Sequence, residues 1–229
     1  MMSSAASSRL RRARGFTLIE LMVVVAIIGL TAAGFALALS DSGGNSLATG
    51  QTLLSTMVTT ARTQAAVQQT ETRLLIYGTR PPAGDPDRFM RLMQVVRAEP
   101  AGQTSTWVPA SAVVSLPRGI YVVPNSTAGL LAAGVIWPTN PPLTSSLAGP
   151  FNPAQVAGTP FGTPATAFYI EFRPDGTVTQ VGTQPYARLL VGTAALANNL
   201  PQFNNSGAVR GLLIRPSGAV TFVNDANSF

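Results

Sequence analysis

Cysteine and histidine are both absent from the 229-residue chain. Their absence excludes disulfide bonds, thiolate nucleophiles, imidazole general bases and nearly all zinc sites. Charged residues make up only 10% of the chain, and none of its carboxylates stands in a motif that pairs a catalytic acid with a base. Hydrophobic residues make up 46%, which is enough for a sizeable core. The composition therefore favours a folded protein without catalytic function.

The positive charge is concentrated at the N-terminus. The formal net charge is +6, and residues 1–15 carry four arginines and no acid. Beyond residue 15, eleven arginines face nine acids, which leaves a net charge of only +2. A strongly basic protein indicates an anionic partner, but here most of the excess lies in a short leader. The rest of the chain is close to neutral.

A long apolar run follows these arginines. The 24 residues of 16–39 contain a single charge, that of Glu20. As a helix with a rise of about 1.5 Å per residue they extend about 36 Å, compared with roughly 30 Å for the hydrocarbon core of a bilayer. Arginines precede the run and none follows it for about twenty residues, which predicts a cytoplasmic N-terminus. We predict a transmembrane helix over 16–40 and an exported remainder.

The junction between the leader and the apolar run has an unusual order. It reads Arg14-Gly15-Phe16-Thr17-Leu18-Ile19-Glu20. An ordinary secretory signal has a shorter apolar region, and its cleavage site lies after that region rather than before it. The order resembles the class III signal of type IV pilins and type II secretion pseudopilins. The resemblance implies cleavage between Gly15 and Phe16 by a prepilin peptidase and N-methylation of Phe16.

The same resemblance gives Glu20 a role in assembly, as the partner of the N-terminal amine of an adjacent subunit. A local interpretation also exists, because Thr17 to Glu20 fits a capping box and Phe16 and Leu21 fit a hydrophobic staple. That interpretation does not explain the Gly15–Phe16 junction or the basic leader. A helix start alone is therefore the weaker explanation.

Small residues within the span would let neighbouring helices approach closely, although such residues occur in any membrane helix: Ala26, Gly29, Ala33 and Gly34. Residues 41–45 include two adjacent glycines, each costing about 1 kcal/mol relative to alanine in a helix. We predict a break or kink there. Helical spacing resumes over 46–71, with an apolar stripe formed by Leu47, Leu54, Val58, Ala61 and Ala65. This soluble half of the helix is expected to pack on a sheet.

Residues 72–229 predict a β-rich periplasmic head, which gives an α+β fold: a long N-terminal helix packed on antiparallel strands. Segments 73–77 and 89–97 are predicted to pair antiparallel. Segments 112–116 and 120–123 are predicted to form a second hairpin through the turn at 117–119.

Two further features of the head have a turn-rich composition. An Arg-Pro-x-Gly-x-Val-Thr pattern begins at Arg173 and again at Arg215, and it predicts two hairpin tips. Residues 125–167 are rich in proline, glycine, serine, threonine and alanine. We predict a surface loop with weak regular structure there, in which 130–137 is a candidate for a short packed element.

The head resembles H-type minor pseudopilins and FimT-like minor pilins, through Leu-Pro-x-Gly-Ile at 116–120 and Phe-Arg-Pro-Asp-Gly at 172–176. It departs from many major pilins by lacking a cysteine pair. The resemblance implies a non-enzymatic minor pseudopilin of a type II secretion pseudopilus, or alternatively a minor pilin of a type IV pilus. Implied partners are other pilin subunits, a prepilin peptidase, an assembly platform with its ATPase, and the inner membrane. No cofactor is implied.

Two binding sites have weak support in the sequence. Asp85 and Asp87 lie in a loop rich in proline and glycine and are candidate calcium ligands, but Asp-Pro turns are common without a metal. Arg173, Arg210 and Arg215 are candidates for a basic patch that binds nucleic acid. The chain has no basic run beyond the leader and little net charge there, which disfavours that function.

Overall fold

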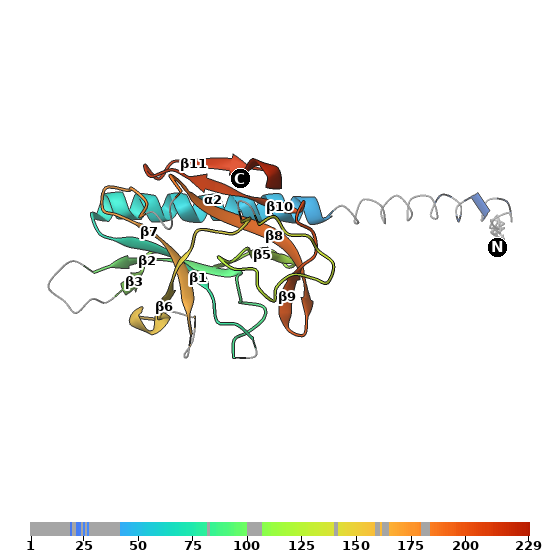
Figure 1. Ribbon diagram of the computed structural model, residues 1–229, viewed down its shortest axis with the longest axis horizontal. Helices are drawn as coiled ribbons and strands as arrows, with labels where there is room; N and C mark the ends of the chain where they lie inside the picture. Colours follow the sequence, from blue (N-terminus) through green and yellow to red (C-terminus); the bar gives the residue numbers. More distant parts are fainter. Residues whose placement is uncertain are drawn as a thin grey trace, which may run out of the picture. The chain divides into compact units, whose positions relative to one another are not determined.

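The computed structural model describes residues 42–81, 83–99, 107–139, 142–158, 161, 165–179 and 184–229, together with Ile19, Met22, Val23, Val25 and Ile27. The chain divides into two units, Met1–Ser42 and Gly43–Phe229, and we call the second unit the head. The head has one long helix packed on antiparallel sheets, which confirms the predicted α+β class (Figure 1).

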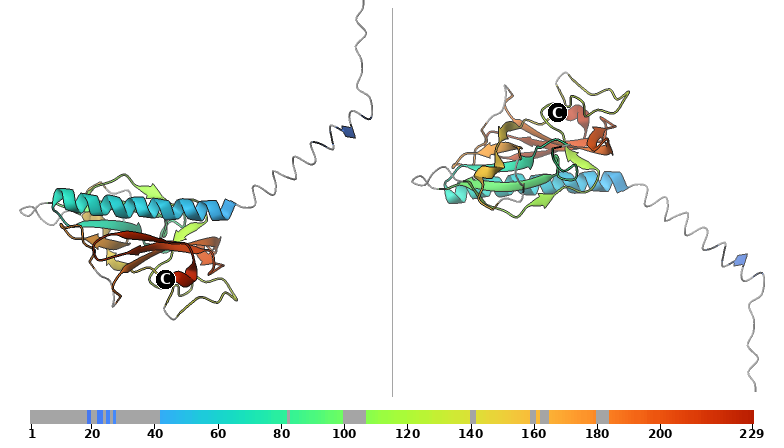
Figure 2. Two further views of the ribbon diagram at one scale, coloured as in Figure 1. Left: turned by 90° about the horizontal axis from the view of Figure 1, so that it is seen from above. Right: turned by 90° about the horizontal axis from the view of Figure 1, so that it is seen from below.

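Helix α2 (Ser42–Gln68) forms one side of the head, and the strands lie on the other side (Figure 2). The predicted apolar stripe is confirmed, since all five of its residues are buried. The predicted break is wrong within 42–45, because α2 already includes these residues. Packing outweighs the low helix propensity of glycine here: Leu47, in the first turns of α2, is only 5% exposed.

The first sheet has the strand order β3-β2-β1-β7-β6, with β4 also paired to β2. Its strands are β1 (Thr72–Tyr77), β2 (Leu92–Ala98), β3 (Trp107–Pro109), β4 (Val114–Ser115), β6 (Ala148–Phe151) and β7 (Ala167–Phe172). The antiparallel pairing of β1 with β2 confirms the first predicted hairpin. Leu74 and Ile76 of β1 join the core that includes α2, whereas Leu75 and Tyr77 join a second apolar cluster. β1 is therefore covered on both faces.

The second sheet has the order β11-β10-β8-β5, with β9 paired to β8. Its strands are β5 (Ile120–Val122), β8 (Ala187–Ala197), β9 (Leu200–Phe203), β10 (Val209–Ile214) and β11 (Val220–Val223). The second predicted hairpin is wrong, because β4 pairs with β2 and β5 pairs with β8. The turn at 117–119 is present, with Ile120 N donating to Pro117 O over 3.1 Å. This turn carries the chain from the first sheet to the second. The sequence therefore predicted the turn correctly, but not the strands with which β4 and β5 pair.

The described residues of 125–167 have little regular structure beyond β6 and a short 3₁₀ helix (Pro153–Gln155), which confirms the predicted weak regular structure. The prediction of a surface loop is wrong, because several of these residues are buried. Phe151 and Phe161 lie in the second apolar cluster, on the face of the first sheet that includes Leu75 and Tyr77. Trp137 is buried against Phe203, with ring centroids 5.6 Å apart. The segment therefore supplies core side chains to both sheets.

Part of segment 125–167 covers the face of the second sheet that is opposite α2. Ile120 faces the helix, because a Cβ on Gly50 of α2 would come within 2.9 Å of Ile120 Cγ2. The next residue, Tyr121, points to the other face and pairs with Gly192. A Cβ on Gly192 would lie 3.2 Å from the ring of Phe203, which is the ring that Trp137 contacts. The second sheet is thus enclosed between α2 and part of 125–167.

The two turns with the Arg-Pro-x-Gly pattern contact each other. The 215–219 turn is the predicted tip of the β10–β11 hairpin, and the 173–177 turn closes in the same way. Val178 N donates to Pro216 O over 2.9 Å, which joins the two turns. A Cβ on Gly218 would lie 2.7 Å from Arg62 Cδ of α2, so the helix packs directly on this joint.

Candidate functional site

The predicted processing and assembly residues, Gly15, Phe16 and Glu20, lie outside the described residues. The predicted helix-packing residues lie outside them too: Ala26, Gly29, Ala33 and Gly34. Five apolar residues of the same stretch are described as helical and are between 52% and 72% exposed: Ile19, Met22, Val23, Val25 and Ile27. Within the part of the chain that the structure describes, no helix has both the length and the apolar character needed to cross a membrane.

Gln51 attaches α2 to the second sheet. Its side chain is only 3% exposed, and its Nε2 donates to Gly211 O over 2.8 Å and to Val223 O over 3.0 Å. These acceptors belong to β10 and β11, so one amide bridges two neighbouring strands. Because a buried amide must keep its hydrogen bonds, Gln51 fixes the rotation of α2 about its axis relative to this sheet. The sequence analysis did not identify this role of Gln51, because its two acceptors lie far along the chain.

Asp85 and Asp87, the candidate calcium ligands, form hydrogen bonds and ion pairs within their own segment. Asp85 Oδ1 accepts from Asp87 N over 2.9 Å, and Asp85 Oδ2 lies 3.3 Å from Arg88 Nε. Asp87 Oδ1 lies 3.3 Å from Arg91 NH1. The described residues contain no group of three or more histidine, cysteine or acidic side chains that could hold a metal ion. The Asp85 carboxylate stabilises the turn, and both carboxylates balance the charge of neighbouring arginines.

Two groups in the head have shifted pKa values. Burial raises the pKa of Tyr121, and the nearby guanidinium of Arg91 opposes that shift. Hydrogen bonds from the Thr177 side chain and backbone hold the pKa of the Asp175 carboxyl below its usual range. Asp175 is an exposed turn residue, whereas Tyr121 is a buried strand residue. Neither shift comes from a paired acid and base, so neither indicates a catalytic site.

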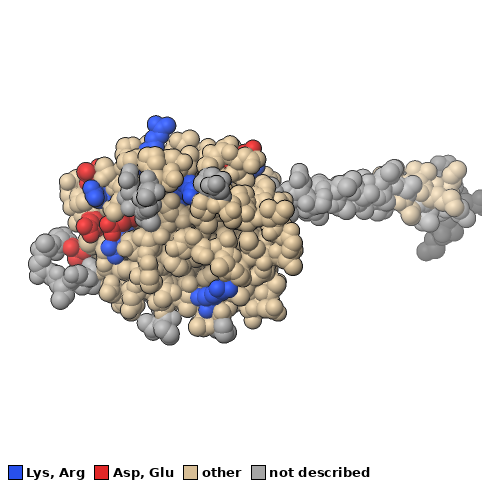
Figure 3. Space-filling model, viewed as in Figure 1, with Lys and Arg blue, Asp and Glu red and all other residues tan. Residues whose placement is uncertain are grey.

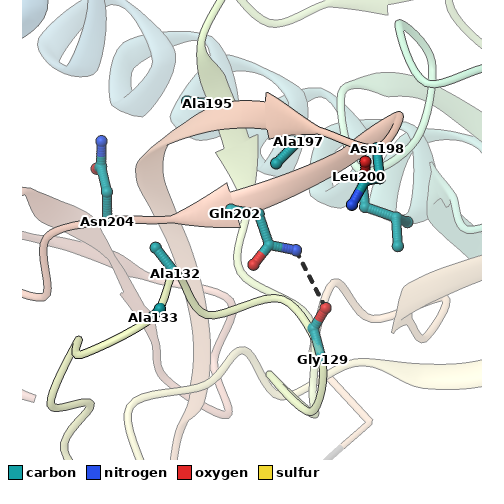
Figure 4. A pocket seen from close by; sticks show the side chains of 9 residues that line it. All are labelled: Gly129, Ala132, Ala133, Ala195, Ala197, Asn198, Leu200, Gln202 and Asn204. Atoms are coloured by element: carbon teal, nitrogen blue, oxygen red, sulfur yellow. Dashed lines mark hydrogen bonds between the residues drawn. The ribbon is translucent and has the colours of Figure 1, made fainter.

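A depression of about 540 Å³ lies beside the β8–β9 hairpin (Figure 4). It is lined by Gly129, Ala132, Ala133, Ala195, Ala197, Asn198, Leu200, Gln202 and Asn204. Gln202 Nε2 donates to Gly129 O over 3.2 Å, and this bond joins the β8–β9 hairpin to segment 125–167. None of these nine side chains is ionisable, so the depression provides no general acid or base.

The N-terminal stretch matches a known motif. Residues 10–36 match the prokaryotic N-terminal methylation motif, and this range contains Gly15, Phe16 and Glu20. Among solved structures it is similar to the type IV minor pilin FimU of Pseudomonas aeruginosa, with a TM-score of 0.40 and 12% identity over 80% of this chain and 91% of that one. No curated protein matches the chain.

The head brings together only part of the predicted basic patch. The turns that carry Arg173 and Arg215 lie side by side, as the bond from Val178 N to Pro216 O shows. Arg210 pairs with Val191 within the second sheet, away from both turns along β10. Charged side chains are few on the face that Figure 3 shows, and most of its acidic side chains gather at the left of the view. Nucleic-acid binding stays a prediction for this chain.

Proposed function

We propose that this chain is a minor subunit of a pilin-like filament, and that the filament is a type II secretion pseudopilus. In this proposal the chain is cleaved after Gly15 and methylated on Phe16. Helix 16–40 then anchors it in the inner membrane, with the N-terminus cytoplasmic and the head periplasmic. The observation that carries the proposal is the methylation motif at 10–36, followed by a helix on which an antiparallel head is built.

Cleavage gives Glu20 a physical role. An ionised carboxylate costs roughly 2.5 to 3.5 kcal/mol at the centre of a membrane helix, and less towards the interface, so it needs a partner. The new amine of Phe16 on an adjacent subunit supplies one. Two opposite charges in an apolar medium specify position more than they add stability. The pair therefore sets the axial register between neighbouring subunits.

The head suits a structural role because α2 is joined to both sheets. Gln51 bonds the helix to β10 and β11, and Arg62 packs on the joined turns of β7 and β10–β11. A displacement of the helix is then transmitted to the whole head. The shifted pKa values and the depression supply no acid–base pair, which supports a non-enzymatic function.

The test is the pair of substitutions Glu20→Ala and Glu20→Gln in cells that contain the complete assembly system. We expect both precursors to be cleaved, because the cleavage site at Gly15 is unchanged. Both should be missing from filaments sheared off and sedimented, since neither side chain can pair with an amine as a carboxylate does. Normal incorporation of either variant would contradict the role of Glu20.

The alternative is a minor pilin of a type IV pilus, because the same N-terminal motif serves both systems. Deleting the gene and measuring two phenotypes separates them. Loss of protein secretion with intact surface pili supports the pseudopilus. Loss of surface pili, of motility or of adhesion with intact secretion supports the pilus.

A further inference from the structure

A cavity of about 300 Å³ lies in the head between the end of β1 and the segment that follows β5. It shares no lining residue with the depression shown in Figure 4. Its interior is apolar, because four of the residues that line it are buried apolar residues: Phe89, Met90, Pro124 and Leu130. A volume of roughly 300 to 1,000 Å³ with a mostly apolar lining is typical of ligand-binding cavities.

The aromatic ring of Phe168 forms one side of the cavity. A Cβ on Gly78 would lie 2.6 Å from Cδ2 and Cε2 of this ring. The ring therefore packs against the bare backbone of Gly78, and both residues line the cavity. A ring in this place offers a flat apolar surface to a bound aromatic or branched group.

The backbone of Met90 connects the cavity to both sheets. Met90 N donates to Tyr77 O of β1 over 2.8 Å, and Val122 N of β5 donates to Met90 O over 2.8 Å. These bonds hold Met90 at a φ of +54°, in the left-handed region that methionine rarely adopts. Backbone strain of this kind recurs at ligand-binding sites. The cavity is preformed, so a ligand does not have to order it on binding.

Arg80 is the one ionisable residue among the described residues that line the cavity, and it is exposed. Its NH2 donates to Gly129 O over 3.4 Å, and no other described residue bonds to its guanidinium. The carboxylates of the same loop, Asp85 and Asp87, pair with other arginines. The cavity therefore combines an apolar interior with a cation that lacks a carboxylate partner in the described part of the head.

We propose that this cavity binds an apolar group that carries a carboxylate. The apolar body packs against Phe168 and the buried side chains, and the carboxylate pairs with Arg80. A guanidinium matches a carboxylate through two parallel hydrogen bonds. One cation balances one negative charge, which favours a carboxylate over a doubly charged phosphate. Either a free organic acid or the last residue of a polypeptide with an apolar side chain carries such a group.

The test is fluorine NMR of the full chain in detergent, with empty micelles as the blank. The probe is N-acetyl-4-fluorophenylalanine, and its neutral match is the corresponding amide. The carboxylate should bind about fivefold more tightly than the amide, which is the contribution of one partly exposed ion pair. Equal dissociation constants for the two probes, or no binding of either up to its solubility limit, would overturn the proposal.

Two pairs of variants locate the binding site, and all four substituted positions are exposed, so the fold should be retained. Arg80→Gln should remove the difference between the two probes, whereas Arg215→Gln removes an equal charge outside the cavity and should keep it. Ala128→Phe fills the cavity and should abolish the binding of both probes, whereas Ala133→Phe lies outside the cavity and should not. A difference that survives Arg80→Gln, or binding that survives Ala128→Phe, would overturn the proposal.

A third probe, 4-fluorophenylacetate, distinguishes the two sources of the ligand. It has the ring and the carboxylate but no peptide group. Binding as tight as that of the acetylated amino acid would support a free organic acid, and weaker binding would support a chain end. Binding is measured on the isolated chain, so its outcome is independent of whether the chain enters a filament.

Discussion

Replacing Gln51 by leucine removes the bridge between α2 and the second sheet at nearly constant side-chain size. Gln51 is 3% exposed and donates to two carbonyl oxygens, Gly211 O at 2.8 Å and Val223 O at 3.0 Å. Each hydrogen bond contributes roughly 0.5 to 1.5 kcal/mol net. We therefore expect Gln51→Leu to lower the free energy of unfolding by about 1 to 3 kcal/mol.

Gln51→Glu should lower stability further at neutral pH. A carboxylate has no proton to donate and would face two carbonyl oxygens in a buried position. Burial should raise the pKa of the new carboxyl above its unfolded value. The protonated form then dominates at low pH, so the loss should shrink as the pH falls and grow as the pH rises.

The assay is urea unfolding of the full chain in detergent, followed by tryptophan fluorescence. Both tryptophans, Trp107 and Trp137, are buried in the head, so their emission reports on its unfolding. Gln68→Leu is the control, because Gln68 is exposed on the same helix and should change stability by less than about 0.5 kcal/mol. Equal midpoints for the two leucine variants would refute the reasoning.

Three further predictions concern the head. Arg188 is 7% exposed and its Nε has no partner among the described residues, so Arg188→Met should raise the free energy of unfolding by about 1 to 3 kcal/mol in urea titrations. Gly218→Ala should cost more stability than Gly134→Ala: their φ angles are +76° and +79°, but only Gly218 also contacts α2. The lowered pKa of Asp175 contributes stability above its unfolded pKa that is lost as the pH falls through the folded pKa. Asp175→Asn should reduce that acid dependence.

Local patterns predicted the features that depend on neighbours in the sequence. The buried stripe of α2 follows from helical spacing, and the β1–β2 pair follows from two apolar runs separated by a turn-rich loop. The predicted break was wrong within 42–45, because the low helix propensity of glycine is a small local effect that the packing of the following turn outweighs.

Long-range contacts account for what the sequence did not predict. The composition of 125–167 is that of a loop, but scattered residues such as Phe151 and Phe161 become core once a sheet lies beside them. Arg73 is another example: its guanidinium lies 4.2 Å from the Trp107 ring centroid and bonds to Glu171, 98 residues away. No periodicity within the chain indicates such partners.

The central claim is that the chain is a processed, pilin-like subunit, and the most direct test is mass spectrometry of the N-terminus of the mature protein from its own cells. Our account predicts that residues 1–15 are absent and that the first residue is Phe16 carrying one added methyl group. An intact leader, or cleavage after the apolar run, would contradict it.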